Sequence, residues 1–275
     1  MLSLHTNAAA LSTQGSLGKT QSALSTSMTR LGTGYRVNSA MDDAAGLQIA
    51  TRLNAQTRGM AVAQRNTQNG ISMLQTAEGA LDEVTNIVLR MKDLATEAAN
   101  GVATADDKTA METEFNDLGN ELTNILTNTK FGGEALLTGG KLAAAVTFQI
   151  GSDAAETYAL NVSADLTAAN TAVTALKAGD LDAAANAAIG LANTALDDIG
   201  TLRSKLGAGA NRLDHVYNNL QNMSTNVTAA KGRIMDVDYA TESSNMTTKQ
   251  MLMQASSSML KQSNSMSGLV MSLLQ

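Results

Sequence analysis

Both ends of the 275-residue chain carry apolar side chains at intervals of seven residues. This spacing places the side chains on one face of a helix, and such a face needs a partner helix to cover it. We therefore predict that the N- and C-terminal segments form a two-helix coiled coil, and that their apolar stripes serve in polymerisation. The predicted polymerisation residues are Leu17, Leu24, Met28, Leu31, Leu252, Met259, Met266 and Leu273.

Two further stretches continue the helical pattern between the ends. Residues 40–100 carry apolar side chains in alternating steps of three and four residues, which predicts one helix about 90 Å long at ~1.5 Å per residue, with a kink near Gly70. A serine–aspartate capping box at residues 39–42 is expected to open this helix. A second capping box at residues 104–107 predicts a shorter antiparallel helix after it.

The second half of the chain changes its period twice. Apolar and polar residues alternate within residues 142–163, which predicts a β-hairpin. Residues 164–180 are small and polar, and are compatible with either a loop or a weakly specified helix. From residue 185 to residue 234 the helical steps return over about seven heptads, which predicts a rod of roughly 75 Å with a left-handed supercoil. Gly207 and Gly209 are the weak point of this rod.

The helical pattern is interrupted at residues 32–38 and 236–245, and these breaks divide the chain. We predict a mainly α fold in two parts. Residues 1–35 and 243–275 form the terminal coiled-coil domain, and residues 36–242 form a long antiparallel helical-bundle rod that carries the hairpin. The few apolar residues of the C-terminal stripe do not offset the entropy of ordering that helix, so we expect the terminal segments to be weakly formed before assembly.

Composition narrows the classes of function. The chain is 44% hydrophobic but only 3% aromatic, which suits thin helix-on-helix seams better than a thick core, and it contains neither proline nor cysteine. The net charge is −6 and the basic residues are scattered, so we expect no nucleic-acid partner. No segment reaches the ~18 uncharged apolar residues of a membrane span. The N-terminus lacks a secretory signal, so export would need a different route.

Candidate catalytic residues each have a structural explanation. Gly18–Thr20 resembles the end of a P-loop, but the upstream glycine of that motif is missing. The paired carboxylates Asp42–Asp43 suit the first turn of a helix, where they complement its dipole. His5 and His215 belong to no metal-binding motif, and there is no cysteine to join them. We therefore predict no catalytic, cofactor-binding or metal-binding residue, and a protein that is not an enzyme.

Several segments at the two ends resemble bacterial flagellin. The similarity extends over roughly residues 1–140 and 185–275, and the segments between them are shorter than the large variable outer domains of many flagellins. The chain therefore looks like a short flagellin without outer domains. The segments that carry the resemblance are Ala23–Ala40, Asp42–Gly46, Thr129–Gly133, Ala210–Leu213, Asp236–Glu242, Ser244–Met246 and Ser272–Gln275.

The resemblance implies a function. Flagellins are structural subunits that polymerise into the extracellular filament of the bacterial flagellum for motility, after export by the flagellar type III apparatus. The terminal helices would form the inner core of the filament and the rod its outer tube. The implied partners are further copies of the chain, an export chaperone on the C-terminal segment, and the filament cap and hook-junction proteins.

The resemblance also implies a receptor contact and leaves one alternative open. Arg90, Leu94 and Glu114 fall on positions that match the patch recognised by the animal Toll-like flagellin receptor. The alternative to a flagellin is a hook–filament junction protein of the flagellum. Such proteins share the architecture of the two ends but match the Asp42–Gly46 and Asp236–Glu242 motifs less closely.

Overall fold

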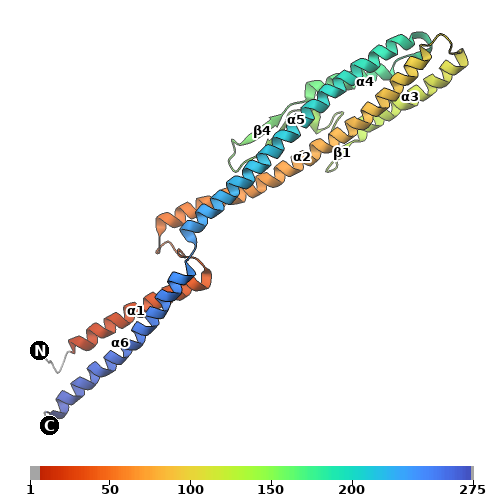
Figure 1. Cartoon of the computed structure of the whole chain (residues 1–275). Helices are drawn as coiled ribbons and strands as arrows, with labels where there is room; N and C mark the ends of the chain where they lie inside the picture. The colour runs from red at the N-terminus through yellow and green to blue at the C-terminus, as the bar shows by residue number, and fades with distance from the viewer. Residues whose placement is uncertain (1–6, 274–275) are drawn as a thin grey trace. The chain divides into compact units, whose positions relative to one another are not determined.

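The computed structural model describes residues 7–273, and the side chains of residues 7–265 (Figure 1). The chain forms two compact units. Residues 1–55 and 226–275 make up one of them, here called the terminal unit, and residues 56–225 make up the central unit. These boundaries lie inside the long helices rather than at the sequence breaks, so the narrower filament-core domain of residues 1–35 and 243–275 stays a prediction.

The described part of the chain is mainly helical, as predicted. A short 3₁₀ helix, η1, covers Lys141–Ala143. The strands are β1 (Lys130–Phe131), β2 (Glu134–Ala135), β3 (Val146–Gln149) and β4 (Thr157–Leu160). The α-helices are α1 (Ala8–Thr33), α2 (Ala44–Ala98), α3 (Ala105–Asn128), α4 (Ser163–Lys177), α5 (Leu181–Met235) and α6 (Tyr239–Leu273).

The central unit is built on α2 and α5, which run antiparallel to each other (Figure 1). Arg203 on α5 fixes their alignment, because its Nη2 atom lies 2.8 Å from a carboxylate oxygen of both Glu78 and Asp82 on α2. Hydrogen bonding to Glu78 raises the pKa of Arg203 above its ordinary value. The apolar series predicted for the two long helices forms the core between them: Leu74, Leu81, Val88, Ala95, Ile199, Leu202, Leu206 and Leu213.

The β3–β4 hairpin packs against this core and confirms the hairpin predicted within residues 142–163. The strands are antiparallel, with Val146 opposite Leu160 and Gln149 opposite Thr157. Residues 164–180, which the sequence left open between loop and helix, form most of α4. This segment is helical because its apolar residues fall on one face and are buried in the core: Leu166, Ala169, Ala172, Val173 and Leu176.

Two glycines predicted as weak points are positions of close packing. The kink predicted near Gly70 is wrong, since α2 continues as one helix through that residue. A Cβ atom at Gly70 would lie 3.0 Å from the Phe148 ring, and one at Gly209 would lie 3.2 Å from the side chain of Leu160. Both glycines therefore let the hairpin approach the helix backbone. The backbone of α5 departs from helical geometry elsewhere, at Ala184 (φ −145°, ψ 42°).

Only one of the two predicted capping boxes opens a helix. Thr104 caps α3, and its hydroxyl, together with its backbone N–H, holds the pKa of Asp107 below its ordinary value. The box predicted at residues 39–42 forms a turn instead, in which the N–H groups of Ser39 and Asn38 donate to Asp42. The helix α2 begins later because Asp43 supplies the cap, accepting a hydrogen bond from the Gly46 N–H at 2.8 Å.

Candidate assembly surface on the terminal helices

Within the terminal unit, α1 and α6 lie side by side and antiparallel (Figure 1). Polar contacts mark the two ends of this pair. At one end the Asn7 Nδ2 atom donates to the Ser263 carbonyl oxygen at 3.1 Å. At the other end the Arg30 Nη1 atom lies 3.8 Å from the Glu242 Oε2 atom. The predicted pairing of the two ends of the chain is therefore present in the structure.

The predicted stripe is correct on α1 except at Met28. Leu24 is buried and 4% exposed, and Leu17 and Leu31 are half-buried. Together with the α6 residues that face them, these side chains form the α1–α6 seam. Met28 is 48% exposed because it lies on the flank of α1 rather than against α6.

On α6 the predicted face is wrong by one residue. Leu252 and Met259 are 51% and 66% exposed and point away from the seam. The half-buried apolar side chains in this part of α6 are instead Met246, Met253 and Leu260, which also fall seven residues apart. Two apolar rows thus lie about 100° apart on this helix, and only one of them faces α1. The side chains of two further predicted residues lie outside the described part: Met266 and Leu273.

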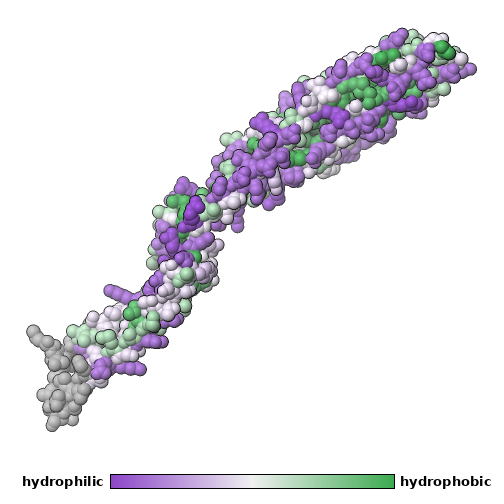
Figure 2. All heavy atoms as spheres, viewed as in Figure 1, coloured by the Kyte–Doolittle hydropathy of each residue, from purple (hydrophilic) through white to green (hydrophobic). Residues whose placement is uncertain are grey.

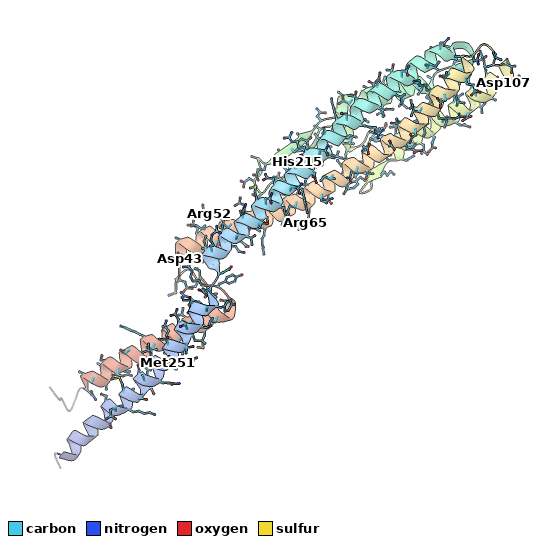
Figure 3. All side chains as sticks on the ribbon, in the orientation of Figure 1. Asp43, Arg52, Arg65, Asp107, His215 and Met251 are labelled. Atoms are coloured by element: carbon cyan, nitrogen blue, oxygen red, sulfur yellow. The ribbon has the colours of Figure 1, made fainter. Side chains whose placement is uncertain are left out.

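The terminal helices expose a second set of apolar side chains, here called the outer apolar residues. Figure 3 shows one of them, Met251, on α6. In the face drawn in Figure 2, the α1–α6 pair is mostly pale or light green, with few hydrophilic side chains. Large apolar side chains that stay exposed on a helix pair are suited to contact with another molecule. The outer apolar residues are Leu11, Met28, Met251, Leu252 and Met259.

A connector joins the terminal helices to the long helices within the terminal unit. Tyr35 forms an antiparallel β-bridge with Asp236. Two backbone hydrogen bonds flank this bridge: the Val237 N–H donates to the Gly34 carbonyl oxygen at 3.0 Å, and the Arg36 N–H donates to a carbonyl oxygen at the end of α5. The predicted break at residues 236–245 is shorter than expected, because α6 begins at Tyr239. Asp238 makes this early start possible, since its carboxylate accepts from the Ala240 N–H at 3.0 Å and from the Thr241 hydroxyl at 2.8 Å.

Charge is distributed unevenly over the terminal helices. The sequence of α1 contains Lys19 and Arg30 and no acidic residue. The sequence of α6 contains Lys249 and Lys261 and a single acidic residue, Glu242, which pairs with Arg30. Acidic side chains that could form ion pairs with another molecule are therefore scarce on these two helices.

The three residues that match the receptor patch do not form one exposed surface. Arg90 on α2 and Glu114 on α3 form an exposed ion pair, with Nη2 and Oε1 2.7 Å apart. Leu94 is only 2% exposed, so in this fold its side chain offers little surface to a receptor. Leu94 belongs to the core beneath the ion pair, whereas the neighbouring Leu89 is 43% exposed.

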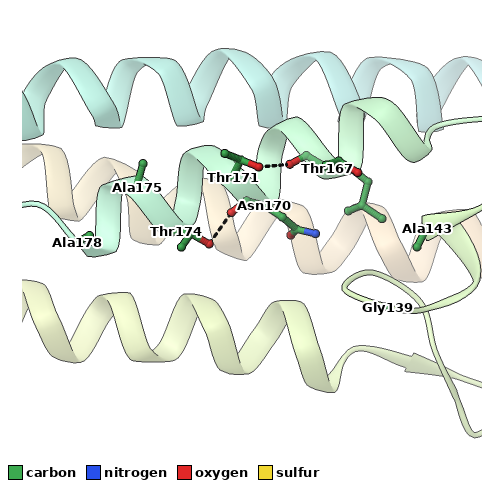
Figure 4. Close-up of a pocket in the computed structure, with 9 residues that line it drawn as sticks. Gly139, Ala143, Thr167, Asn170, Thr171, Thr174, Ala175 and Ala178 are labelled. Atoms are coloured by element: carbon green, nitrogen blue, oxygen red, sulfur yellow. Dashed lines mark hydrogen bonds between the residues drawn. The ribbon is translucent and has the colours of Figure 1, made fainter.

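The remaining candidates give no sign of catalytic chemistry. A groove of about 550 Å³ runs along α4 (Figure 4), and none of its nine lining residues is charged. The Thr171 and Thr174 hydroxyls on this groove donate to carbonyl oxygens of their own helix. Gly18–Thr20 is part of α1 rather than a phosphate-binding loop, and His215 lies exposed on α5 (Figure 3), while His5 falls outside the described residues.

The described residues contain neither a candidate metal cluster nor a membrane-spanning helix. Across residues 7–273, no cluster of three or more histidine, aspartate or glutamate side chains is arranged to hold a metal ion. Within the same range, no helix is long and apolar enough to cross a membrane.

Comparison with known proteins places this architecture in a family. Residues 4–141 match the N-terminal helical region of bacterial flagellin, and residues 189–274 match its C-terminal helical region. A flagellin of Halalkalibacterium halodurans is 41% identical over 249 residues, covering 90% of each chain. A flagellin of Bacillus subtilis (strain 168) is 38% identical over 300 residues, covering 98% of each chain.

A solved structure of a flagellar hook-associated protein from Vibrio parahaemolyticus is also similar. Its TM-score is 0.60 and its sequence identity is 19%, over 71% of this chain and 100% of that chain. At this identity the likeness shows a shared fold and does not favour the junction-protein alternative. The two family regions and the two flagellin relatives decide the matter: the chain belongs to the bacterial flagellins, the structural subunits of the flagellar filament.

Proposed function

We propose that this flagellin polymerises by packing the outer apolar residues of one α1–α6 pair against the α1–α6 pairs of neighbouring copies. In this proposal, some of the predicted polymerisation residues make contacts within one chain and the others make contacts between chains. Leu17, Leu24 and Leu31 hold the helix pair of one chain together, whereas Met28, Leu252 and Met259 join one chain to the next. A structural role of this kind needs no catalytic group.

One observation carries this proposal. The α1–α6 seam is already occupied on both sides, yet Leu252 and Met259 remain 51% and 66% exposed on the same helix. No part of the described chain covers this second apolar row. Its exposure to water is unfavourable in free energy, and burial against another copy would remove that penalty. The scarcity of acidic residues on these helices supports the same reading, because it leaves few ionic contacts as alternatives.

We expect the variant Met259→Ser to raise the critical concentration for polymerisation about tenfold. Full burial of a methionine gains about 1.5–3 kcal/mol, and Met259 has two-thirds of its surface still to bury. Seeded growth followed by sedimentation measures the effect. The control is Val102→Ser, which removes an exposed apolar side chain from the turn between α2 and α3. If both variants polymerise like the parent chain, the outer apolar residues do not form the interface.

The same surface is suited to binding partners before assembly. We propose that the chain is exported through the flagellar type III apparatus and functions outside the cell. Before export a chaperone would cover the C-terminal segment, and at the filament tip the chain would meet the cap and hook-junction proteins. The exposed methionines Met251 and Met259 support a shared chaperone and filament surface, since methionine side chains adapt to differently shaped partners.

A second role is favoured by the exposed ion pair of Arg90 and Glu114. We propose that the animal Toll-like flagellin receptor contacts these two residues together with Leu89, and not Leu94. In cells that report receptor activation, Arg90→Ala should weaken the response at least about tenfold, as expected when an interface arginine is lost. Lys92→Ala on the same helix is the control. If Arg90→Ala gives the same receptor response as the parent chain, the proposed receptor contact is contradicted.

A further inference from the structure

The apolar side chains on both sides of the α1–α6 seam recur every seven residues. If one helix slides along the other by seven residues, each apolar side chain therefore meets another apolar side chain. Burial gains nearly the same free energy in either register, so the apolar contacts alone do not select one of them. The repeating seam residues are Leu17, Leu24 and Leu31 on α1 and Met246, Met253 and Leu260 on α6.

An ion pair lies inside this seam, next to the connector. The Arg30 and Glu242 side chains are 29% and 10% exposed, and their nearest charged atoms are 3.8 Å apart. The Nε atom of Arg30 is buried and has no hydrogen-bond partner among the described residues. Because the two side chains are partly shielded from water and their charged atoms are 3.8 Å apart, this ion pair adds little to stability. Buried polar groups in coiled coils are best known for selecting one register.

The next position on the same face of α6 strengthens the selection. Seven residues after Glu242 comes Lys249, which is half-buried. In a pair shifted by one heptad, Lys249 would stand opposite Arg30, and two like charges would meet where both side chains are partly shielded from water. A shift in the opposite direction would place Met235 opposite Arg30, and a shift in either direction would break the β-bridge of the connector.

We propose that Arg30 and Glu242 select the register of the terminal helix pair, while Lys249 disfavours the shifted one. At the far end of the pair, the contact between Asn7 and Ser263 fits the same register. A shift of seven residues would move the outer apolar residues of α6 by about 10 Å along α1. A shifted chain would therefore present a different surface to neighbouring copies. The proposal concerns the helix pair of a single chain, and so goes beyond the assembly surface itself.

Cysteine cross-linking tests the register directly, because the chain contains no cysteine of its own. The register that joins Asn7 to Ser263 places Leu17 opposite Met253, and a one-heptad shift places Leu17 opposite Leu260. The full-length variants Leu17→Cys/Met253→Cys and Leu17→Cys/Leu260→Cys therefore report the native and the shifted register in the monomer. Under the same mild oxidation, we expect the native reporter to cross-link at least about fivefold more than the shifted reporter.

Charge reversal should change this preference. In Arg30→Glu, residue 30 repels Glu242 in the native register and attracts Lys249 in the shifted one, so the shifted reporter should dominate. In Arg30→Glu/Glu242→Arg the native attraction returns beside an intact connector, and the native reporter should recover.

A native reporter that still dominates in Arg30→Glu overturns the proposal. If Arg30→Glu cross-links in neither register, the result with Arg30→Glu/Glu242→Arg is decisive. If the native reporter does not recover its cross-linking in that double variant, the proposal is also overturned. Polymerisation is scored separately in chains without cysteine. A wrong register assignment then leaves the assembly proposal standing, and a failed assembly proposal leaves the register result standing.

Discussion

We expect a chain that ends at residue 246 to remain a soluble, largely helical monomer and to form no filaments. The deletion removes Met253 and Leu260 from the α1–α6 seam, and with them Leu252 and Met259 of the outer apolar residues. Leu17 then loses the part of α6 that covers it, and neighbouring copies lose the surface they would bind. At about 1.5–3 kcal/mol for each fully buried apolar side chain, the lost contacts far exceed the contribution of any single substitution.

The central unit should survive this deletion, because its core lies entirely within residues 56–225. Circular dichroism should therefore retain the helical signal of α2 to α5, and the main thermal transition should stay within a few degrees of that of the full chain. Seeded growth viewed by electron microscopy measures assembly. Filaments of normal length from the shortened chain would contradict the proposal that the terminal helices form the polymer contacts.

The long helices and the hairpin could be predicted from the sequence because each has one apolar face. In α2 and α5 the steps of three and four residues leave a single row that can be buried, and Leu81 and Leu206 on these rows are fully buried. In the hairpin, alternation identifies the buried face, and Tyr158 and Leu160 are buried as alternation requires. Local pattern determines the structure wherever it offers only one solution.

The C-terminal seam could not be assigned in this way because α6 offers two solutions. Its rows through Leu252 and Met253 are both apolar and both repeat every seven residues. Heptad counting does not distinguish them. In the structure the row through Met253 is half-buried against α1, whereas Leu252 is 51% exposed. This difference depends on how α6 lies against a helix more than 200 positions away in the chain, which a local pattern does not contain.

Burial at other positions depends in the same way on distant segments. Leu94 matches a receptor-contact position in sequence, but its side chain is covered in the core of the central unit. Gly70 and Gly209 look like defects in a helix until the hairpin is placed against them. The sequence therefore predicted the fold better than the candidate site. Whether a residue is exposed depends on every segment that packs near it, including segments far away in the chain.

Replacement of Gly34 by alanine should lower the free energy of unfolding of the terminal unit by about 2 kcal/mol and impair polymerisation. Gly34 ends α1 in the left-handed conformation, with φ 76° and ψ 3°. An alanine in that conformation costs about 1–2 kcal/mol. Its Cβ atom would also lie 2.9 Å from the Tyr239 hydroxyl oxygen, so that exposed side chain must turn away. The Gly34 carbonyl accepts the Val237 N–H, so strain here reaches the pairing of the connector.

Gly32 is the matched control for this prediction. It lies two residues earlier in α1, and a Cβ atom there would meet nothing within 4 Å. Alanine favours a helix by about 1 kcal/mol over glycine, so Gly32→Ala should be neutral or slightly stabilising. Thermal denaturation and seeded polymerisation of the two variants separate the effect of the left-handed conformation from that of an added methyl group. Equal behaviour of Gly32→Ala and Gly34→Ala would mean that the geometry of the connector does not limit assembly.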